Sequence, residues 1–196
     1  AFTVTFSEPI TGFDATDVSN GGTATGWSVA SVTSAGGNAY TVTFNGGTGS
    51  DGTVAPRIAA GSVSDAAGNA GPASAANGDP VTVDRVAPSV QSLTATTPTK
   101  ASSIAYTLTF SEPVSGLAAG DFTVGGTSSG WAVSGVSAAS GTTVTVQLSR
   151  SAPSDGTVVL TLGAGAVSDA AGNAGPASAF TGTTVTVDRT APTVAS

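Results

Sequence analysis

The sequence contains no cysteine and no histidine, and lysine occurs once, as Lys100. Without cysteine the chain has no disulfide and no thiol chemistry. Without histidine as well, the usual ligand sets of zinc and copper are absent. General acid–base and nucleophilic chemistry is left to aspartate and glutamate, and no Gly-x-Ser-x-Gly element occurs. We therefore expect that the protein is not an enzyme.

Positive charge is also scarce. Twelve acidic residues against five basic ones give a formal net charge of −7. A protein that binds nucleic acid places several Lys and Arg side chains against phosphates, so we expect no nucleic-acid partner. No charged and then apolar leader occurs, and no apolar run is long enough to cross a bilayer, so we expect no membrane insertion. Acidic groups without basic partners must be solvated or must share a cation.

The most informative feature that is present is a tandem repeat. Residues 63–72 return unchanged as residues 167–176, an offset of 169 − 65 = 104 between the two aspartates. About half of the positions aligned at this offset are identical, with no gap, which indicates two adjacent copies of one module. The same offset relates four further pairs of segments, namely 6–9 and 110–113, 26–27 and 130–131, 51–54 and 155–158, and 83–85 and 187–189.

The second copy predicts an all-β domain. Its apolar residues alternate with small polar ones, as in Tyr106, Leu108 and Phe110, which we expect to face the core. No segment has a helical period, and the apolar runs are separated by turn residues, a pattern typical of an all-β sandwich or barrel, of which we favour the sandwich. We predict two tandem Ig-like Greek-key β-sandwiches of about seven strands each, arranged as a rod. The expected strands are 87–95, 104–110, 121–124, 131–136, 143–148, 158–162 and 184–188.

The repeat also predicts the domain boundaries. Residues 1–86 form the first Ig-like repeat without its opening strand, residues 87–190 form the complete second repeat, and residues 191–196 begin a third. A sandwich without that edge strand exposes backbone groups and an apolar groove. Residues upstream of Ala1 or a strand from another chain would cover the groove, and we favour the first. Pro56 replaces Leu160 in a strand, which predicts an edge position or a bulge.

Several motifs together resemble one family. Phe-Ser-Glu-Pro, Asp-Gly-Thr-Val, the Asp-Ala-Ala-Gly-Asn of residues 169–173 and the Val-Asp-Arg-Thr-Ala-Pro of residues 187–192 resemble the bacterial Ig-like repeats of large secreted and outer-surface adhesins. The resemblance covers essentially the whole chain. It implies an extracellular stalk that often depends on calcium.

Oxygen-bearing side chains gather in the loops that an Ig-like topology brings to one end. Glu112 and Asp121 flank the loop between the second and third strands, Asp169 and Asn173 lie in the loop between the last two, and Asp84 lies in the entering linker. Calcium takes six to eight oxygen ligands. We predict a Ca²⁺ site with Glu112, Asp169 and Asn173 as first choices, Asp84 as a bridging ligand and Asp121 as a further candidate. The corresponding candidates are Glu8, Asp17, Asp65 and Asn69 in the first repeat, and Asp188 at the junction with a third repeat.

Other roles for these polar residues stay open. Asp65 and Asp169 could form Asx-turns, with the glycines and asparagines of the same loops at positive φ. Asp51 and Asp155 lie in Ser-Asp-Gly-Thr turns at the opposite end and are expected to be structural. Trp27 and Trp131 could stack on a sugar, although a core position is favoured for a tryptophan on an alternating strand. Arg85 and Arg189 could balance the acidic cluster or lie along a neighbouring unit.

The expected function is that of structural stalk repeats. The linker 84–88 lacks glycine, and Pro88 favours an extended Ala87, so the connection is short and stiff. We expect Ca²⁺ at the inter-domain junction to stiffen a bacterial extracellular adhesin, located outside the cell or on its surface. The expected partners are neighbouring Ig-like repeats of the same chain, with host or surface ligands bound by other parts of the parent protein. The alternatives are an Ig-like module that binds carbohydrate or protein, and a piece of a surface-layer or filament subunit.

Overall fold

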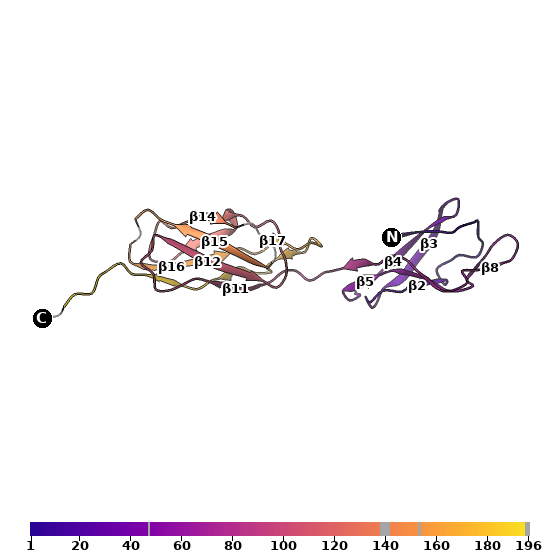
Figure 1. Ribbon diagram of the computed structural model, residues 1–196, viewed down its shortest axis with the longest axis horizontal. Helices are drawn as coiled ribbons and strands as arrows, with labels where there is room; N and C mark the ends of the chain where they lie inside the picture. Colours follow the sequence, from indigo (N-terminus) through magenta and orange to yellow (C-terminus); the bar gives the residue numbers. More distant parts are fainter. Residues whose placement is uncertain (47, 138–141, 153, 195–196) are drawn as a thin grey trace. The chain divides into compact units, whose positions relative to one another are not determined.

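In a computed structural model the chain forms two compact units, Ala1–Arg85 and Val86–Ser196. The structure describes residues 1–46, 48–137, 142–152 and 154–194. The start of a third repeat, expected at 191–196, therefore falls partly outside the described residues. Within those ranges the secondary structure is β-strand, with a single 3₁₀ turn (Figure 1). None of the described residues belongs to a helix with the length and apolarity needed to span a membrane.

The second unit is a sandwich of two antiparallel sheets. One sheet has the order β11–β12–β15–β14, and in the other β16 lies between β13 and the pair β19 and β20 (Figure 1). This is the strand order of an immunoglobulin constant-type domain, and it confirms the predicted fold class. The elements are β11 (Val90–Thr94), β12 (Ser103–Phe110), the 3₁₀ turn (Ala119–Asp121), β13 (Phe122–Gly125), β14 (Ala132–Val136), β15 (Thr143–Ser149), β16 (Gly156–Leu162), β17 (Val167–Ser168), β18 (Ala174–Gly175), β19 (Phe180–Thr181) and β20 (Val185–Val187).

The core of this unit follows from the alternation along its strands. Tyr106, Leu108 and Phe110 on β12 are 0–1% exposed, as the sequence predicts. The hydroxyl of Tyr106 donates to the carbonyl oxygens of Val158 and Thr183, at 3.3 and 2.8 Å. Burial of the hydroxyl raises the pKa of Tyr106 to about 12. The phenol therefore stays neutral and ties β12 to the opposite sheet.

The first unit has the same plan with one strand fewer. Its first sheet has the order β1–β4–β3, and no described strand occupies the place that β11 takes in the second unit. The second sheet is divided into β2–β6–β9 and β5–β10. The elements are β1 (Phe2–Thr5), β2 (Val18–Asn20), β3 (Ser28–Gly36), β4 (Ala39–Asn45), β5 (Gly52–Val54), β6 (Pro56–Ile58), β7 (Val63–Ser64), β8 (Ala70–Gly71), β9 (Ala76–Asn77) and β10 (Val81–Val83).

Pro56 lies in a central strand, so the expectation of an edge position was wrong. Strand β6 pairs with β2 on one side and β9 on the other, and Pro56 is its first residue, after an interruption at Ala55. Because proline has no N–H to donate, the first residue of a strand tolerates it. The Asn20 side chain bridges the interruption, since its Oδ1 accepts from the N–H of Ala55 at 3.1 Å.

The two tryptophans differ in how their indole nitrogens are satisfied. Trp131 is 7% exposed, and its Nε1 donates to the Ser128 hydroxyl at 3.1 Å. This confirms the core prediction for Trp131. Trp27 is half-buried, its ring centroid lies 5.2 Å from Arg85 Cζ, and its buried Nε1 has no hydrogen-bond partner among the described residues. Ala24, the counterpart of Ser128 at the 104-residue offset, offers no acceptor at this position.

This difference gives a reciprocal prediction. Ala24→Ser is expected to stabilise the first unit by about 1 kcal/mol, because it supplies Trp27 with an acceptor. Ser128→Ala should cost the second unit about 1–3 kcal/mol, because it leaves the Trp131 N–H buried and unpaired. Urea unfolding followed by tryptophan fluorescence measures both changes. No gain from Ala24→Ser would show that the Trp27 nitrogen reaches another acceptor.

Candidate metal centre

Two loops meet at the end of the second unit where the chain enters. Ser115 and Ser168 exchange backbone hydrogen bonds of 2.8 and 3.0 Å, which join the loop after β12 to the β17–β18 hairpin. At the same end, Ser89 and Ser111 are joined by two hydrogen bonds, one from the Ser89 N–H to the Ser111 hydroxyl and one from the Ser111 N–H to the Ser89 carbonyl. These contacts fix the loop that carries Glu112 beside the loop that carries Asp169.

The loop between β17 and β18 is organised by the Asp169 carboxylate. Oδ1 accepts from the N–H groups of Ala171 and Asn173 at 2.8 and 2.9 Å, and Oδ2 accepts from the Asn173 amide at 2.8 Å. The Asn173 side-chain bond, followed by the backbone donors, lowers the pKa of Asp169 against the effect of burial. Asp169 is 6% exposed, so it is a buried carboxylate that stays ionised at neutral pH.

The first unit repeats this loop bond for bond. Asp65 accepts from Ala67, from the Asn69 N–H and from the Asn69 amide at 2.8–2.9 Å. Gly68 and Gly172 adopt φ values of +86° and +91°, as the Asx-turn reading requires. Neither asparagine has a positive φ, so that part of the reading was wrong. The Asx-turn is therefore present in both units, whatever else the aspartates bind.

Two carboxylates of the second unit converge next to this loop. One oxygen of Glu112 and one oxygen of Asp169 lie within 4.8 Å of each other. Glu112 is partly exposed, and Asp169 is buried. Asp84, the expected bridging ligand, belongs to the first unit and is also partly exposed. Like charges at this spacing repel one another, and a shared cation would relieve the repulsion. The donor set consists of oxygen alone, which fits Ca²⁺. That an ion binds here remains a prediction.

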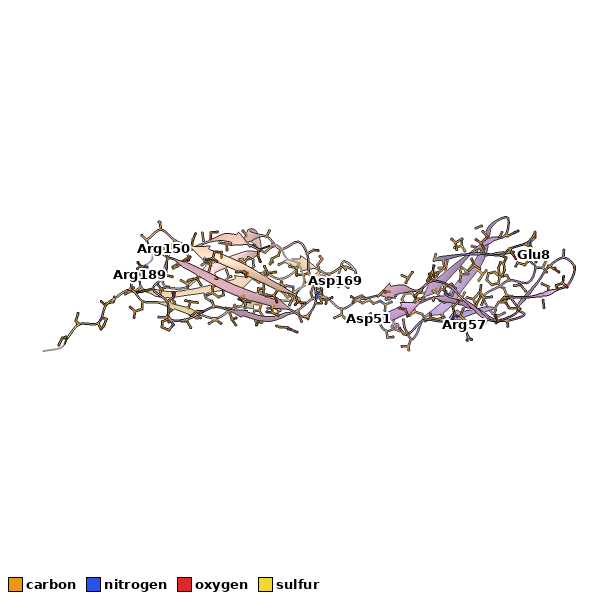
Figure 2. All side chains as sticks on the ribbon, in the orientation of Figure 1. Glu8, Asp51, Arg57, Arg150, Asp169 and Arg189 are labelled. Atoms are coloured by element: carbon orange, nitrogen blue, oxygen red, sulfur yellow. The ribbon has the colours of Figure 1, made fainter. Side chains whose placement is uncertain are left out.

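Basic residues of the second unit lie away from this group. Arg150 and Arg189 lie at the opposite end of the sandwich from Asp169 (Figure 2). The Arg189 guanidinium donates to the backbone carbonyl of Lys100. The backbone of Lys100, the third basic residue of the second unit, therefore lies at the same end as Arg189. Arg85 follows Asp84 in sequence, but its guanidinium donates to the Gly49 and Gly46 carbonyls at 2.6 and 2.7 Å. Both guanidinium groups therefore bind backbone carbonyls of their own units, a contact that neither of the two expected roles included.

The remaining candidates make contacts of other kinds. The Asn173 amide donates to Asp169 at 2.8 Å, and the Asp121 carboxylate accepts from the Ala118 N–H at 2.7 Å, within its own turn. The Asp17 carboxylate accepts from the Asp14 N–H at 2.8 Å, and the Asp188 carboxylate accepts from the Thr190 N–H at 3.0 Å. In the first unit, Glu8, Asp65 and Asn69 line one hollow of about 200 Å³.

The serines that join the two loops were missed by sequence reasoning. Ser168 and its counterpart Ser64 precede the loop aspartate in both copies, and Thr11 in the first unit takes the place of Ser115. The sequence signal was the serine that precedes the loop aspartate in both copies. Ser168 pairs through its backbone with Ser115, 53 residues away, and a local sequence pattern does not reveal such a pairing.

Asp155 forms a structural contact at the opposite end, where its turn was expected to be structural. Its carboxylate accepts from the Thr190 hydroxyl at 2.5 Å and from the Arg189 N–H at 2.8 Å. The Thr190 bond, followed by the Arg189 bond, lowers the pKa of Asp155.

The sign of the resulting pH dependence follows from linkage. Because the folded pKa lies below the unfolded value of about 4, Asp155 contributes its stabilisation above that value and loses it as pH falls toward the folded pKa. The thermal midpoint of the second unit should therefore exceed that of Asp155→Asn at pH 7, and the difference should shrink as the pH falls below about 4. A difference that stays constant over this range would contradict the assignment.

Comparison with known families identifies the module. Residues 1–80 and 84–187 each match the bacterial Ig-like domain family, and the chain belongs to that family. The second match begins at Asp84, so Asp84, Glu112 and Asp169 all fall within it. A search of curated proteins and a search of solved structures found no match. The family is one of non-catalytic modules, and its tandem repeats support a structural, extender role.

Proposed function

We propose that the two repeats are extender modules of a bacterial extracellular or surface protein, and that Ca²⁺ stiffens the segment by which the chain enters the second repeat. The observation that carries the proposal is the approach of the Glu112 and Asp169 carboxylates to within 4.8 Å of each other, at the end of the second repeat where the chain enters. Asp84 lies in the entering segment, and the other two residues lie in loops of the second repeat. An ion shared by all three would tie this segment to the sandwich.

Each of the three ligands would make a different contribution. Asp169 already uses both oxygens in its own loop, so it would present a carboxylate held in place before the ion arrives. Glu112 lies in a loop fixed by Ser111 and Ser115. Asp84 would be the ligand that is ordered on binding. Backbone carbonyls and water would complete the six to eight oxygens that Ca²⁺ requires.

The ion would add little to the stability of the folded sandwich, but it would restrain the segment by which the chain enters. Extracellular calcium modules bind with dissociation constants of about 10⁻⁴ to 10⁻³ M. At ten times that constant the ion contributes about 1.4 kcal/mol, enough to order the entering segment. The sandwich has its own buried core, from Leu93 to Val187, and does not need the ion to fold. Chelation is therefore expected to loosen the connection before either unit unfolds.

Small-angle scattering tests the proposal. With millimolar Ca²⁺ the maximum dimension should be well defined, and with a chelator the distribution of distances should broaden while each unit stays folded by circular dichroism. Glu112→Gln should behave like the chelated protein under both conditions. Identical scattering with Ca²⁺ and with chelator would leave extender repeats without a calcium restraint.

A further inference from the structure

The first unit has an open apolar groove along the outer edge of β1. The hollow measures about 360 Å³ and is lined by Phe2, Val4 and Ile58, by Thr3 and Pro56, and by residues 76–79. Strand β1 pairs with β4 on its other edge, and no described strand pairs with the edge that faces the groove. The groove therefore combines an apolar floor with backbone groups that can receive a strand.

The second unit shows what fills this position in the same fold. There β11 pairs antiparallel with β12, the counterpart of β1, with Leu93 opposite Leu108. Leu93 is 2% exposed, and its carbonyl accepts from the Thr183 N–H at 2.9 Å. A Cβ on Gly182 would lie 2.6 Å from Leu93 Cγ, so the glycine makes room for this leucine. The first unit keeps the glycine, as Gly78, on the wall of its groove.

The burial of matched residues records the same difference. Tyr106, Leu108 and Phe110 are almost fully buried on β12, which pairs with β11. Their counterparts Phe2, Val4 and Phe6 in the first unit are only half-buried. A strand laid on β1 would remove this apolar surface from water and would pair the open edge, and both terms favour binding.

We propose that this groove binds one extended segment with the chemistry of β11, in which a leucine enters the hollow beside Gly78 and small polar residues alternate with it. By the offset of 104, the segment runs antiparallel to β1, with its leucine opposite Val4 and the next residue opposite Thr3. Charge also favours such a partner. Residues 1–85 carry seven acidic side chains and two arginines, whereas residues 88–100 carry Lys100 as their one charged side chain. Asp79 on the groove wall disfavours an acidic strand.

The test uses the whole chain and a synthetic peptide with the sequence of residues 88–100. Amide resonances are followed by ¹⁵N–¹H correlation spectra in the presence of a chelator, so the result does not depend on the calcium proposal. We expect saturable shifts at residues 2–6 and 76–79. Residues 106–110 and 180–183 provide an internal control, because β11 already covers their edge, and they should not shift.

A matched peptide decides whether the leucine carries the binding. The peptide with Leu93→Asp should bind about ten- to a hundredfold more weakly, since it puts a charge in the apolar hollow and loses the buried leucine. Equal shifts with both peptides, or no shift at millimolar peptide, would overturn the proposal. Concentration-dependent shifts at residues 2–6 without peptide would also overturn it, because a second copy of the chain would then be the occupant.

Discussion

Replacing Phe110 by alanine is expected to lower the free energy of unfolding of the second unit by about 3–5 kcal/mol. Phe110 is 1% exposed and belongs to a core cluster that spans both sheets. Truncation removes the ring from this core and leaves a cavity that the surrounding strands refill only in part. Differential scanning calorimetry of the whole chain, with the second unit's transition assigned through Trp131 fluorescence, measures the loss.

Phe6→Ala is the matched control for this experiment. Phe6 is the counterpart of Phe110 but is half-buried, and its ring contacts Phe13 and Tyr40 edge-on, with centroids 5.1 and 5.8 Å apart. Because Phe6 buries less apolar surface than Phe110, Phe6→Ala should lower the free energy of unfolding of its unit by about half as much. Equal losses in the two units would show that the open edge of β1 does not weaken the first core.

The second large effect is expected from Asp169→Ala. This change removes the carboxylate that lies beside Glu112 and also removes the acceptor that orders the β17–β18 loop. Calcium affinity should fall about tenfold or more, and the amides of Ala171 and Asn173 should lose protection from hydrogen exchange. Isothermal titration calorimetry and exchange measurements on one sample separate the two effects.

Asp65→Ala distinguishes loop order from ion binding. Asp65 makes the same three hydrogen bonds in the first unit, but it is not one of the carboxylates that we propose as ligands at the second repeat. Its replacement should release the amides of Ala67 and Asn69 and leave calcium binding at the second repeat unchanged. If Asp65→Ala weakened calcium binding as much as Asp169→Ala, the assignment of the site to the second repeat would be wrong.

The sequence was sufficient for the fold because the repeat supplies two independent copies of each pattern. Alternation around Leu108 and Phe110 predicts both the strand and its buried face, and the structure confirms them. Pro56 was misplaced because the sequence does not show the interruption at Ala55 that makes Pro56 the first residue of β6. The neighbouring Asn20 bridges the interruption through a side-chain hydrogen bond that no periodicity reveals.

The candidate site could be predicted only down to its loops. Topology places Glu112 and Asp169 at one end, but side-chain direction decides which oxygens meet. Asp121 is close to Glu112 in sequence, yet its carboxylate binds Ala118 in its own turn. A short Asp in a turn finds a local N–H more readily than a distant partner. The pairing of Ser115 with Ser168, which fixes the two loops, is made by backbone groups, so it depends little on which side chains the sequence places there.

Calcium titration of the whole chain by isothermal calorimetry, beside Glu112→Gln, tests whether the second repeat binds Ca²⁺ through these carboxylates. Glu112→Gln removes one charge beside Asp169 and keeps the Asp169 carboxylate and the donors that bind it. We expect binding with a dissociation constant of about 10⁻⁴ to 10⁻³ M and at least about tenfold weaker binding by the variant. No heat of binding at millimolar Ca²⁺, or the same affinity in both proteins, would contradict this expectation.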